Sequence, residues 1–201
     1  MDTLQVLKDA LYFLSVVNPI SKVLFLSTYT PALTGRQNFQ LSWQSSLAAL
    51  LILLVLAFGG DFLLGTVFRI DLYSLKISGG IILFFTGYFA VRDGHFFLDE
   101  RHKVENFREL SIVPLAAPLI AGPGTIAITL TFTQETGFLH AATVAAAALL
   151  LNFIMMAFSQ PVGKILQRLK MTGPLIRLTG LVVATLAVQM ILNGLNDWRG
   201  Q

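Results

Sequence analysis

The chain has no cysteine and only three histidines, and these shortages exclude several kinds of chemistry. Without cysteine it has no disulfide, no thiolate metal ligand and no cysteine nucleophile. The three histidines, His95, His102 and His140, do not follow a spacing that is typical of a metal site. We therefore expect neither a bound metal nor a cofactor.

Charged residues are also scarce. They make up 12% of the 201 residues, whereas about a quarter of a soluble domain is charged. Hydrophobic residues make up 55%, and the charges are crowded into short segments between long apolar runs. This distribution is typical of an integral membrane protein, whose surroundings are the lipid bilayer. The net charge of +3 follows from where the charges lie and does not indicate a nucleic-acid partner.

Several apolar segments approach the length of about 20 residues that crosses roughly 30 Å of hydrocarbon. We predict six transmembrane spans, which are Ala10–Thr28, Leu47–Val67, Leu75–Val91, Leu110–Phe132, His140–Phe158 and Leu175–Leu192. Together they predict a single transmembrane domain over residues 1–201.

Two segments that lie far apart in the sequence have the same order of residue types. Leu75-Lys76-Ile77-Ser78-Gly79 opens the third predicted span, and Ile176-Arg177-Leu178-Thr179-Gly180 opens the sixth. Each has an aliphatic, a cationic, an aliphatic, a hydroxyl and a glycine residue in turn. Pro19 and Pro123 match in the same way in the first span of each half. An internal repeat explains these matches, and chance similarity between apolar sequences is the alternative.

The repeat divides the chain into residues 1–91 and residues 110–201, joined by a cytoplasmic linker over residues 92–109. Because each repeat has three spans, the second must enter the membrane from the opposite side. We therefore predict an all-α membrane protein with six transmembrane helices, arranged as two inverted three-helix repeats. Many secondary transporters have this architecture, with the substrate site where the repeats meet.

Lysine and arginine are distributed unevenly between the two sides of the predicted membrane. One side carries Arg36, Arg92, Arg101, Lys103, Arg108, Lys164, Arg168, Lys170 and Arg177, and the other carries only Lys8, Arg69, Lys76 and Arg199. Basic residues favour the cytoplasmic side. Both termini are therefore predicted to face the periplasm.

The first span of each repeat contains a proline that must interrupt a helix. Proline removes a backbone donor and clashes with the preceding turn. Asn18-Pro19 also resembles a helix start, because asparagine is a favoured N-cap and proline is favoured at the next position. Gly122-Pro123 forms the same kind of start with a weaker cap. We predict that each of these spans ends one half-helix and begins a second at its proline.

The starts of the second half-helices predict a binding site for a small solute. Amides near Ile20 and Ser21, and near Gly124 and Thr125, lack helical partners. A helix N-terminus carries about half a positive charge and attracts anions. Inverted topology aims both N-termini at one region, where a carboxylate can be held without a buried arginine. The predicted substrate-binding residues are Asn18, Pro19, Ile20, Ser21, Gly122, Pro123, Gly124 and Thr125. The alternative is that the prolines merely bend the spans.

Three other polar residues lie within predicted spans and have two interpretations each. Asp61 is a candidate for coupling to H⁺ or Na⁺, or it is solvated at the membrane interface. Lys22 follows the first break and either attracts a carboxylate or extends its side chain to the cytoplasmic interface. Asn152 either faces the pocket or joins two helices by a hydrogen bond.

The chain resembles the MarC family of bacterial integral membrane proteins. The resemblance is carried by Asn18-Pro19-Ile20, by Ile77-Ser78-Gly79-Gly80-Ile81-Ile82-Leu83-Phe84 and by Val113-Pro114-Leu115-Ala116-Ala117-Pro118-Leu119-Ile120-Ala121-Gly122-Pro123-Gly124. It implies six spans in the inner membrane, and some relatives are described as ion-driven carriers of glycine and alanine. Family members often continue the first break as Pro-x-Gly-Asn, whereas this chain has Pro19-Ile20-Ser21-Lys22.

We predict a secondary transporter of a small polar solute, with small neutral amino acids as the best candidates and an ion gradient as the driving force. We do not expect an enzyme, because the spans contain no nucleophile with a suitable base and no metal-ligand set. The alternative is a non-transporting membrane scaffold or regulatory subunit. That alternative explains the spans but gives the paired breaks no role.

Overall fold

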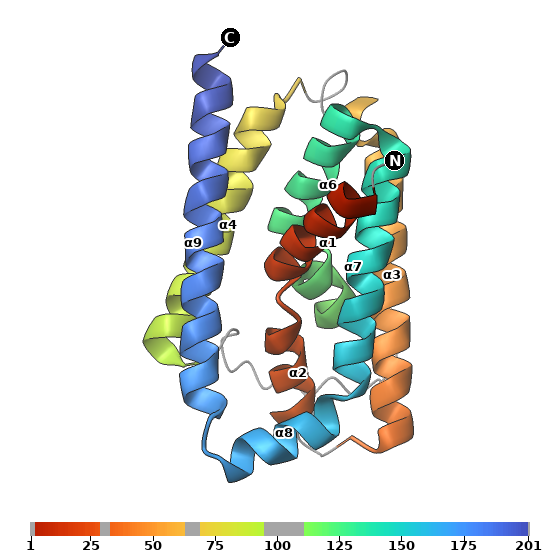
Figure 1. Ribbon diagram of the computed structural model, residues 1–201, viewed down its shortest axis with the longest axis vertical. Coiled ribbons are helices and arrows are strands. Elements are labelled where there is room, and N and C mark those ends of the chain that lie inside the picture. Colours follow the sequence, from red (N-terminus) through yellow and green to blue (C-terminus); the bar gives the residue numbers. More distant parts are fainter. Residues whose placement is uncertain (1–2, 29–32, 63–68, 95–110, 201) are drawn as a thin grey trace.

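The computed structural model describes residues 3–28, 33–62, 69–94 and 111–200, and these residues are almost entirely helical (Figure 1). The helices are α1 (Thr3–Val17), α2 (Pro19–Thr28), α3 (Gly35–Asp61), α4 (Leu72–Asp93), the π-helix η2 (Ser111–Ile120), α6 (Pro123–Thr136), α7 (Phe138–Ala157), α8 (Ser159–Arg168) and α9 (Thr172–Arg199). The predicted all-helical class is confirmed.

Four of these helices, α3, α4, α7 and α9, are each long and apolar enough to cross a membrane. α1 and α2 pass the same test together, as a pair bent by 41°. η2 and α6 form a second broken apolar pair, which gives six spans when both pairs are counted. The molecule is therefore a multi-pass membrane protein. The start of the fourth predicted span and most of the predicted linker lie outside the described residues.

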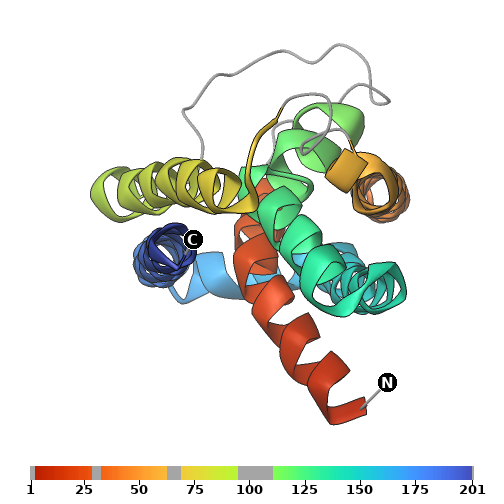
Figure 2. The same cartoon turned by 90° about the horizontal axis from the view of Figure 1, so that it is seen from above.

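The helices form three layers when the molecule is viewed from above (Figure 2). α4 and α9 make an antiparallel pair on one side, and α3 and α7 make another on the opposite side (Figures 1 and 2). The broken pairs, α1 with α2 and η2 with α6, lie between them. The breaks are therefore placed in the interior of the helix bundle.

Glycine allows the backbones of α4 and α9 to touch. A Cβ atom on Gly87 would lie 2.6 Å from the carbonyl oxygen of Gly180, and one on Gly80 would lie 2.9 Å from that of Ala187. Only a residue without a side chain fits such contacts, which are common between membrane helices. The close approach makes α4 and α9 one packed unit.

α3 begins well before the predicted span, because a capping box stabilises its first turn. The Thr34 hydroxyl accepts from the Gln37 amide at 3.3 Å, and the Gln37 side-chain oxygen accepts from the Thr34 amide at 2.9 Å. Each group satisfies a donor that the helix start leaves free. The helix therefore extends from Gly35 through a polar turn before its apolar part begins.

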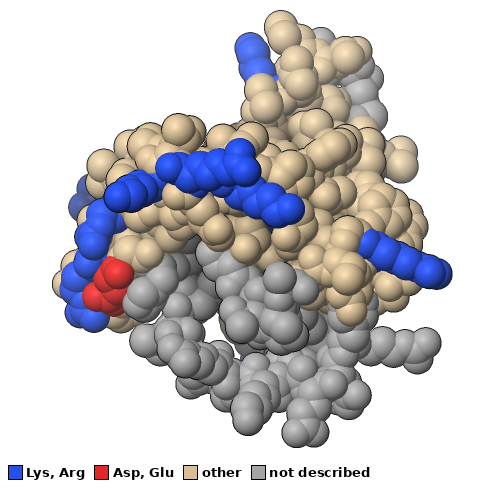
Figure 3. All heavy atoms as spheres, turned by 90° about the horizontal axis from the view of Figure 1, so that it is seen from below, with Lys and Arg blue, Asp and Glu red and all other residues tan. Residues whose placement is uncertain are grey.

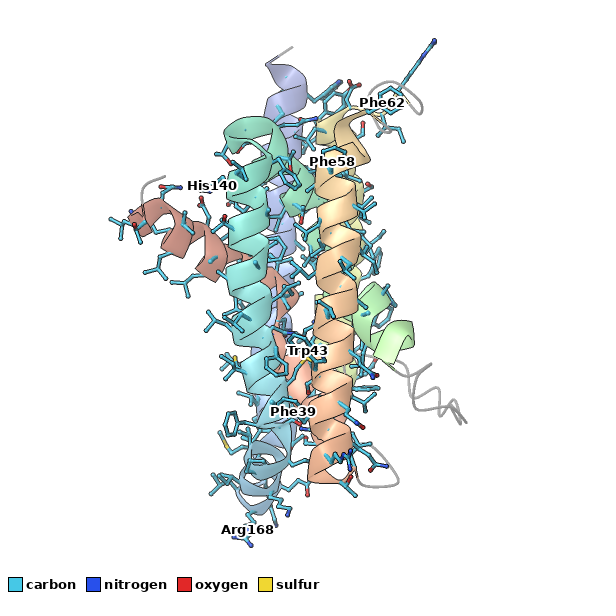
Figure 4. All side chains as sticks on the ribbon, turned by 90° about the vertical axis from the view of Figure 1, so that its right-hand side faces the viewer. Phe39, Trp43, Phe58, Phe62, His140 and Arg168 are labelled. Atoms are coloured by element: carbon cyan, nitrogen blue, oxygen red, sulfur yellow. The ribbon has the colours of Figure 1, made fainter. Side chains whose placement is uncertain are left out.

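Aromatic side chains lie near both ends of the α3–α7 pair (Figure 4). Phe39 and Trp43 pack edge-on against Phe153, with ring centroids 5.5 and 5.7 Å apart, and Phe58 packs against Phe138 at 5.9 Å. All but the half-buried Phe153 are exposed. Two exposed aromatic bands of this kind are typical of the membrane–water interfaces.

The two ends of the molecule differ in charge. Both termini lie at one end, and α8 lies across the other (Figure 1). Lysine and arginine gather on the α8 end (Figure 3), where the exposed basic residues are Arg36, Arg92, Lys164, Arg168, Lys170 and Arg177. Arg101, Lys103 and Arg108, predicted for the same side, lie outside the described residues.

Candidate functional site

The first break separates α1, which ends at Val17, from α2, which begins at Pro19. Asn18 joins them with a φ of +53°, a left-handed conformation that asparagine adopts more readily than most residues. The expected side-chain cap is absent, since the Asn18 side chain makes no hydrogen bond with any described residue. Instead, the Ser21 hydroxyl donates to the Asn18 carbonyl at 2.7 Å.

The second break separates η2 from α6, which begins at Pro123. The Ala121 amide donates to the Ala116 carbonyl at 2.8 Å, the five-residue step of a π-helix. Gly122 is extended, and a Cβ atom there would lie 2.5 Å from the carbonyl oxygen of Pro118. The Thr125 hydroxyl donates to the Gly122 carbonyl at 2.9 Å and to the Ile120 carbonyl at 2.8 Å. Only glycine fits this turn without a shift of the backbone.

The two breaks lie against each other. A Cβ atom on Gly124 would lie 3.1 Å from Cγ1 of Val16 and 3.2 Å from a methyl carbon of Leu83. The last turn of α1 therefore rests on the first turn of α6. Residues that flank both breaks belong to one buried core, namely Val16, Val17, Leu119, Ile120 and Ala121.

The structure thus places Gly124, a predicted site residue of the second break, against the end of α1 that precedes Asn18. Asn18, Pro19, Ser21, Gly124 and Thr125 are buried. Ile20, Gly122 and Pro123 are partly buried. Their role in substrate binding stays a prediction.

Several amides at the breaks have no backbone acceptor. Within the described residues this holds for the amides of Ile20, Gly124 and Thr125, because the turn before each helix is open. The Ser21 amide was expected to be free as well, but it donates to the Asn18 carbonyl at 3.1 Å. The remaining free amides lie on both sides of the contact between the breaks.

Lys22 does not extend to the interface, so that interpretation is wrong. Its side chain folds back, and its ammonium group donates to the carbonyl of Val17, the last residue of α1. The residue is only 4% exposed. The ammonium group forms no ion pair with any residue that the structure describes.

Two other candidates contribute less to this site. Asp61 is the last residue of α3, and its side chain lies outside the described part of the chain, so its coupling role stays a prediction. Asn152 is fully buried, and its amide group donates to the Met156 sulfur within α7 at 3.1 Å. Its oxygen accepts no hydrogen bond in the described residues, so it does not join two helices there.

Three polar clusters outside the breaks were not expected from the sequence. His140 and Asp9 join α7 to α1 through a contact of 2.8 Å. The Asn38 amide group donates to the Met156 and Ala157 carbonyls, at 3.1 and 3.0 Å, at the end of α7. In both cases the partners are far apart in sequence, so the sequence did not predict the contacts. The one available signal is that Asp9 and His140 lie at the edges of predicted spans, on the same side of the predicted membrane.

Lys76 is the centre of the third cluster, which lies at the end of the molecule that carries the termini. Its ammonium nitrogen is 2.9 Å from Asp197 and 3.4 Å from Glu135. The residue joins α4 to both α6 and α9. It lines a hollow of about 350 Å³ together with Ile70, Asp71, Leu72, Tyr73, Gln134, Glu135 and Asp197.

These features define a multi-pass helical membrane protein built around two helix breaks that meet in its interior. A sequence profile described as "MarC family integral membrane protein" matches residues 4–199. The chain therefore belongs to the MarC family of integral membrane proteins.

Similar proteins occur in both bacteria and archaea. A UPF0056 membrane protein of Pyrococcus horikoshii is 31% identical over 94% of this chain and 93% of its own length. The UPF0056 membrane protein YvbG of Bacillus subtilis is 31% identical, over 90% of this chain and 89% of its own. One from Methanocaldococcus jannaschii is 30% identical, with coverage of 90% and 91%. No solved structure matches the chain.

Proposed function

We propose that the chain is a secondary transporter of a small polar solute, which it binds where the two helix breaks meet. One observation carries the proposal: the last turn of α1 rests on the first turn of α6 at Gly124. Opened backbone in a membrane is stable only where it is packed in protein or lines a cavity. Two breaks in contact, with unpaired amides beside them, are the usual setting of a solute site in a transporter.

Small neutral amino acids are the solutes that we propose, as the family resemblance implies. Their carboxylate fits the free amides of Gly124 and Thr125, which begin a helix. A gradient of H⁺ or Na⁺ supplies the driving force.

We further propose that the two halves are inverted repeats. α1, α3 and α4 run in directions opposite to those of α6, α7 and α9 in order (Figure 1). Equivalent helices also lie side by side, α3 with α7 and α4 with α9. Ser21 and Thr125 support the same correspondence, because each follows its proline by two residues and donates to the carbonyl before that proline.

The layers suggest how such a transporter moves. The α4–α9 unit contacts the second break through Gly79, where a Cβ atom would lie 3.1 Å from the Pro123 carbonyl oxygen. Small residues at this contact allow the unit to slide against α6. Lys76 ties the same unit to Glu135 of α6 at the terminus end. Separation of this pair would open the site toward that end.

We infer that the basic α8 end faces the cytoplasm and that both termini face the periplasm of an inner membrane. The exposed lysine and arginine side chains on the α8 end support this orientation (Figure 3). A reporter that is active only in the cytoplasm, fused after Gln201, is expected to be inactive. An active reporter would reverse the orientation.

Transport can be tested with the purified full chain in liposomes. Uptake of labelled glycine and alanine is measured with an inward gradient of H⁺, of Na⁺, or of neither. The variant Gly122→Leu is expected to abolish uptake, because a side chain there meets the Pro118 carbonyl. Gly59→Leu is the matched control, since Gly59 has open space around its Cβ position. It is expected to transport normally.

The fold of each variant is checked by gel filtration and circular dichroism before uptake is compared. Equal uptake by folded Gly122→Leu and by the unchanged chain would place the solute elsewhere. No uptake of either solute under any gradient, with association to partner proteins preserved, would favour the non-transporting scaffold.

A further inference from the structure

The Lys22 ammonium group is buried beside the first break, and most of its donors have no partner among the described residues. An ammonium group has three N–H donors, and among the described residues it makes one hydrogen bond, to the Val17 carbonyl. Its surroundings in the described residues offer no carboxylate within ion-pair distance. A charged group in a low-dielectric interior is costly unless it is paired, and such groups within membranes mark solute and ion pathways.

Capping the end of α1 does not by itself require a charge. At the second break the Thr125 hydroxyl caps the Ile120 carbonyl with a neutral donor at 2.8 Å. The residue that matches Lys22 after the second proline is Ile126, which cannot donate at all. The positive charge is therefore a property of the first break alone.

Other hydrogen-bond donors belong to the two breaks near the Val17 carbonyl that Lys22 contacts. Asn18 is 8% exposed, and its side chain makes no hydrogen bond with the described residues. Val16, one residue before the carbonyl that Lys22 contacts, lies against Gly124. The amides of Gly124 and Thr125 have no backbone acceptor in the described residues. An ammonium group, a carboxamide and unpaired amides together complement an oxygen pair that carries a negative charge.

We propose that Lys22 recognises the carboxylate of the transported solute, so that the site selects solutes with a carboxylate over the corresponding amides. This proposal rests on the proposed function. A carboxylate is the chemical group that the site requires, and Lys22 is the residue that binds it. A solute carboxylate completes the hydrogen bonds of the ammonium group and supplies its missing counter-charge.

The test measures binding to the purified full chain by calorimetry. The probes are glycine, alanine and acetate, each compared with its amide: glycinamide, alaninamide and acetamide. The unchanged chain is expected to bind at least one carboxylate about tenfold or more tightly than its amide, because hydrogen bonds to charged groups are the stronger kind. Lys22→Gln is expected to bring that ratio close to one, and Lys22→Arg to keep most of it.

Lys8→Gln is the matched control, because Lys8 is exposed on α1, and it is expected to keep the full ratio. Lys22→Met supplies a second neutral variant if Lys22→Gln does not fold. Its apolar side chain removes the buried charge without adding a polar group.

Two results would overturn the proposal, and they are distinguishable. If the neutral variants keep the carboxylate preference while Gly122→Leu abolishes uptake, the transporter stands and Lys22 is not its carboxylate group. If the unchanged chain neither binds nor transports any of these solutes, the proposed function fails together with the role of Lys22.

Discussion

The two helix breaks have the same position in their half of the chain but are built differently. The first follows an α-helix and turns at Asn18 with a positive φ, whereas the second follows a π-helix and turns at an extended Gly122. At the second break the Thr125 hydroxyl caps the Ile120 carbonyl. At the first break the Lys22 ammonium group donates to the Val17 carbonyl. A proline fixes where a helix opens, but the neighbouring residues decide what the opening can bind.

The largest effect is expected from the crowded glycine of the second break. Gly122→Ala places a methyl group 2.5 Å from the Pro118 carbonyl oxygen, and such overpacking costs about 1–3 kcal/mol. We expect a lower melting temperature in detergent and a loss of uptake. Gly59→Ala, at a position with open space, is the control. An unchanged melting temperature would show that this turn tolerates a side chain.

The hydroxyl groups of the two breaks are expected to contribute unequally to the free energy of unfolding. The single hydroxyl donor of Thr125 is shared between the Ile120 and Gly122 carbonyls, that of Ser21 goes to the Asn18 carbonyl, and both residues are buried. In Ser21→Ala the Asn18 carbonyl keeps the Ser21 amide as a donor, whereas in Thr125→Val the Ile120 carbonyl loses the hydroxyl. Because a buried carbonyl that loses its donor costs about 1–3 kcal/mol, Thr125→Val should lower the free energy of unfolding more than Ser21→Ala. Thermal unfolding of both variants checks this order, and the reverse order would contradict it.

The ion pair at the terminus end is expected to have a moderate effect on access to the interior. Lys76 pairs with Glu135 and Asp197, whose side chains are 57% and 48% exposed. Of these two pairs, only the one with Glu135 joins the α4–α9 unit to α6. One such pair is worth about 0.2–1 kcal/mol, so breaking it shifts an opening equilibrium by at most about fivefold. The chain has no cysteine, so a single Leu72→Cys site reports access through its rate of labelling by a maleimide.

Lys76→Gln is expected to raise that labelling rate, and Lys164→Gln, at an exposed lysine of α8, is the control. A rate that falls, or that rises equally in the control, would remove Lys76 as a closing contact.

The smallest effect is expected at the turn of the first break. Asn18 adopts a φ of +53°, which glycine adopts at less cost than any other residue. Asn18→Gly should raise the free energy of unfolding by less than about 1 kcal/mol, even though it removes a carboxamide from the candidate site. A clear loss of stability would mean that the side chain holds the turn.

The sequence predicted the breaks well because proline acts locally. Pro19 and Pro123 begin α2 and α6, as the loss of a donor and the clash with the preceding turn require. The apolar lengths also located the spans, although α3 and α9 extend beyond their predicted limits. The capping box at Thr34 and Gln37 was a sequence signal for the first of these extensions.

Other features depend on contacts that no local pattern reveals. The π-helix before Gly122 packs against α3, a contact between distant parts of the sequence. The position of Lys22 was misjudged because a long side chain in a membrane can reach either outward or back to its own backbone. Asp9 and His140 are 131 residues apart, so their pairing follows from the packing of α1 on α7.

The most direct test asks whether one solute protects both breaks. In this cysteine-free chain, Ser21→Cys and Thr125→Cys each provide one thiol at a matched position, and glycine is tested for protection against a maleimide. We predict protection of both thiols, with the same glycine concentration for half-protection, because a single bound solute lies between the two breaks. Protection of only one thiol, or half-protection at clearly different concentrations, would contradict a shared site.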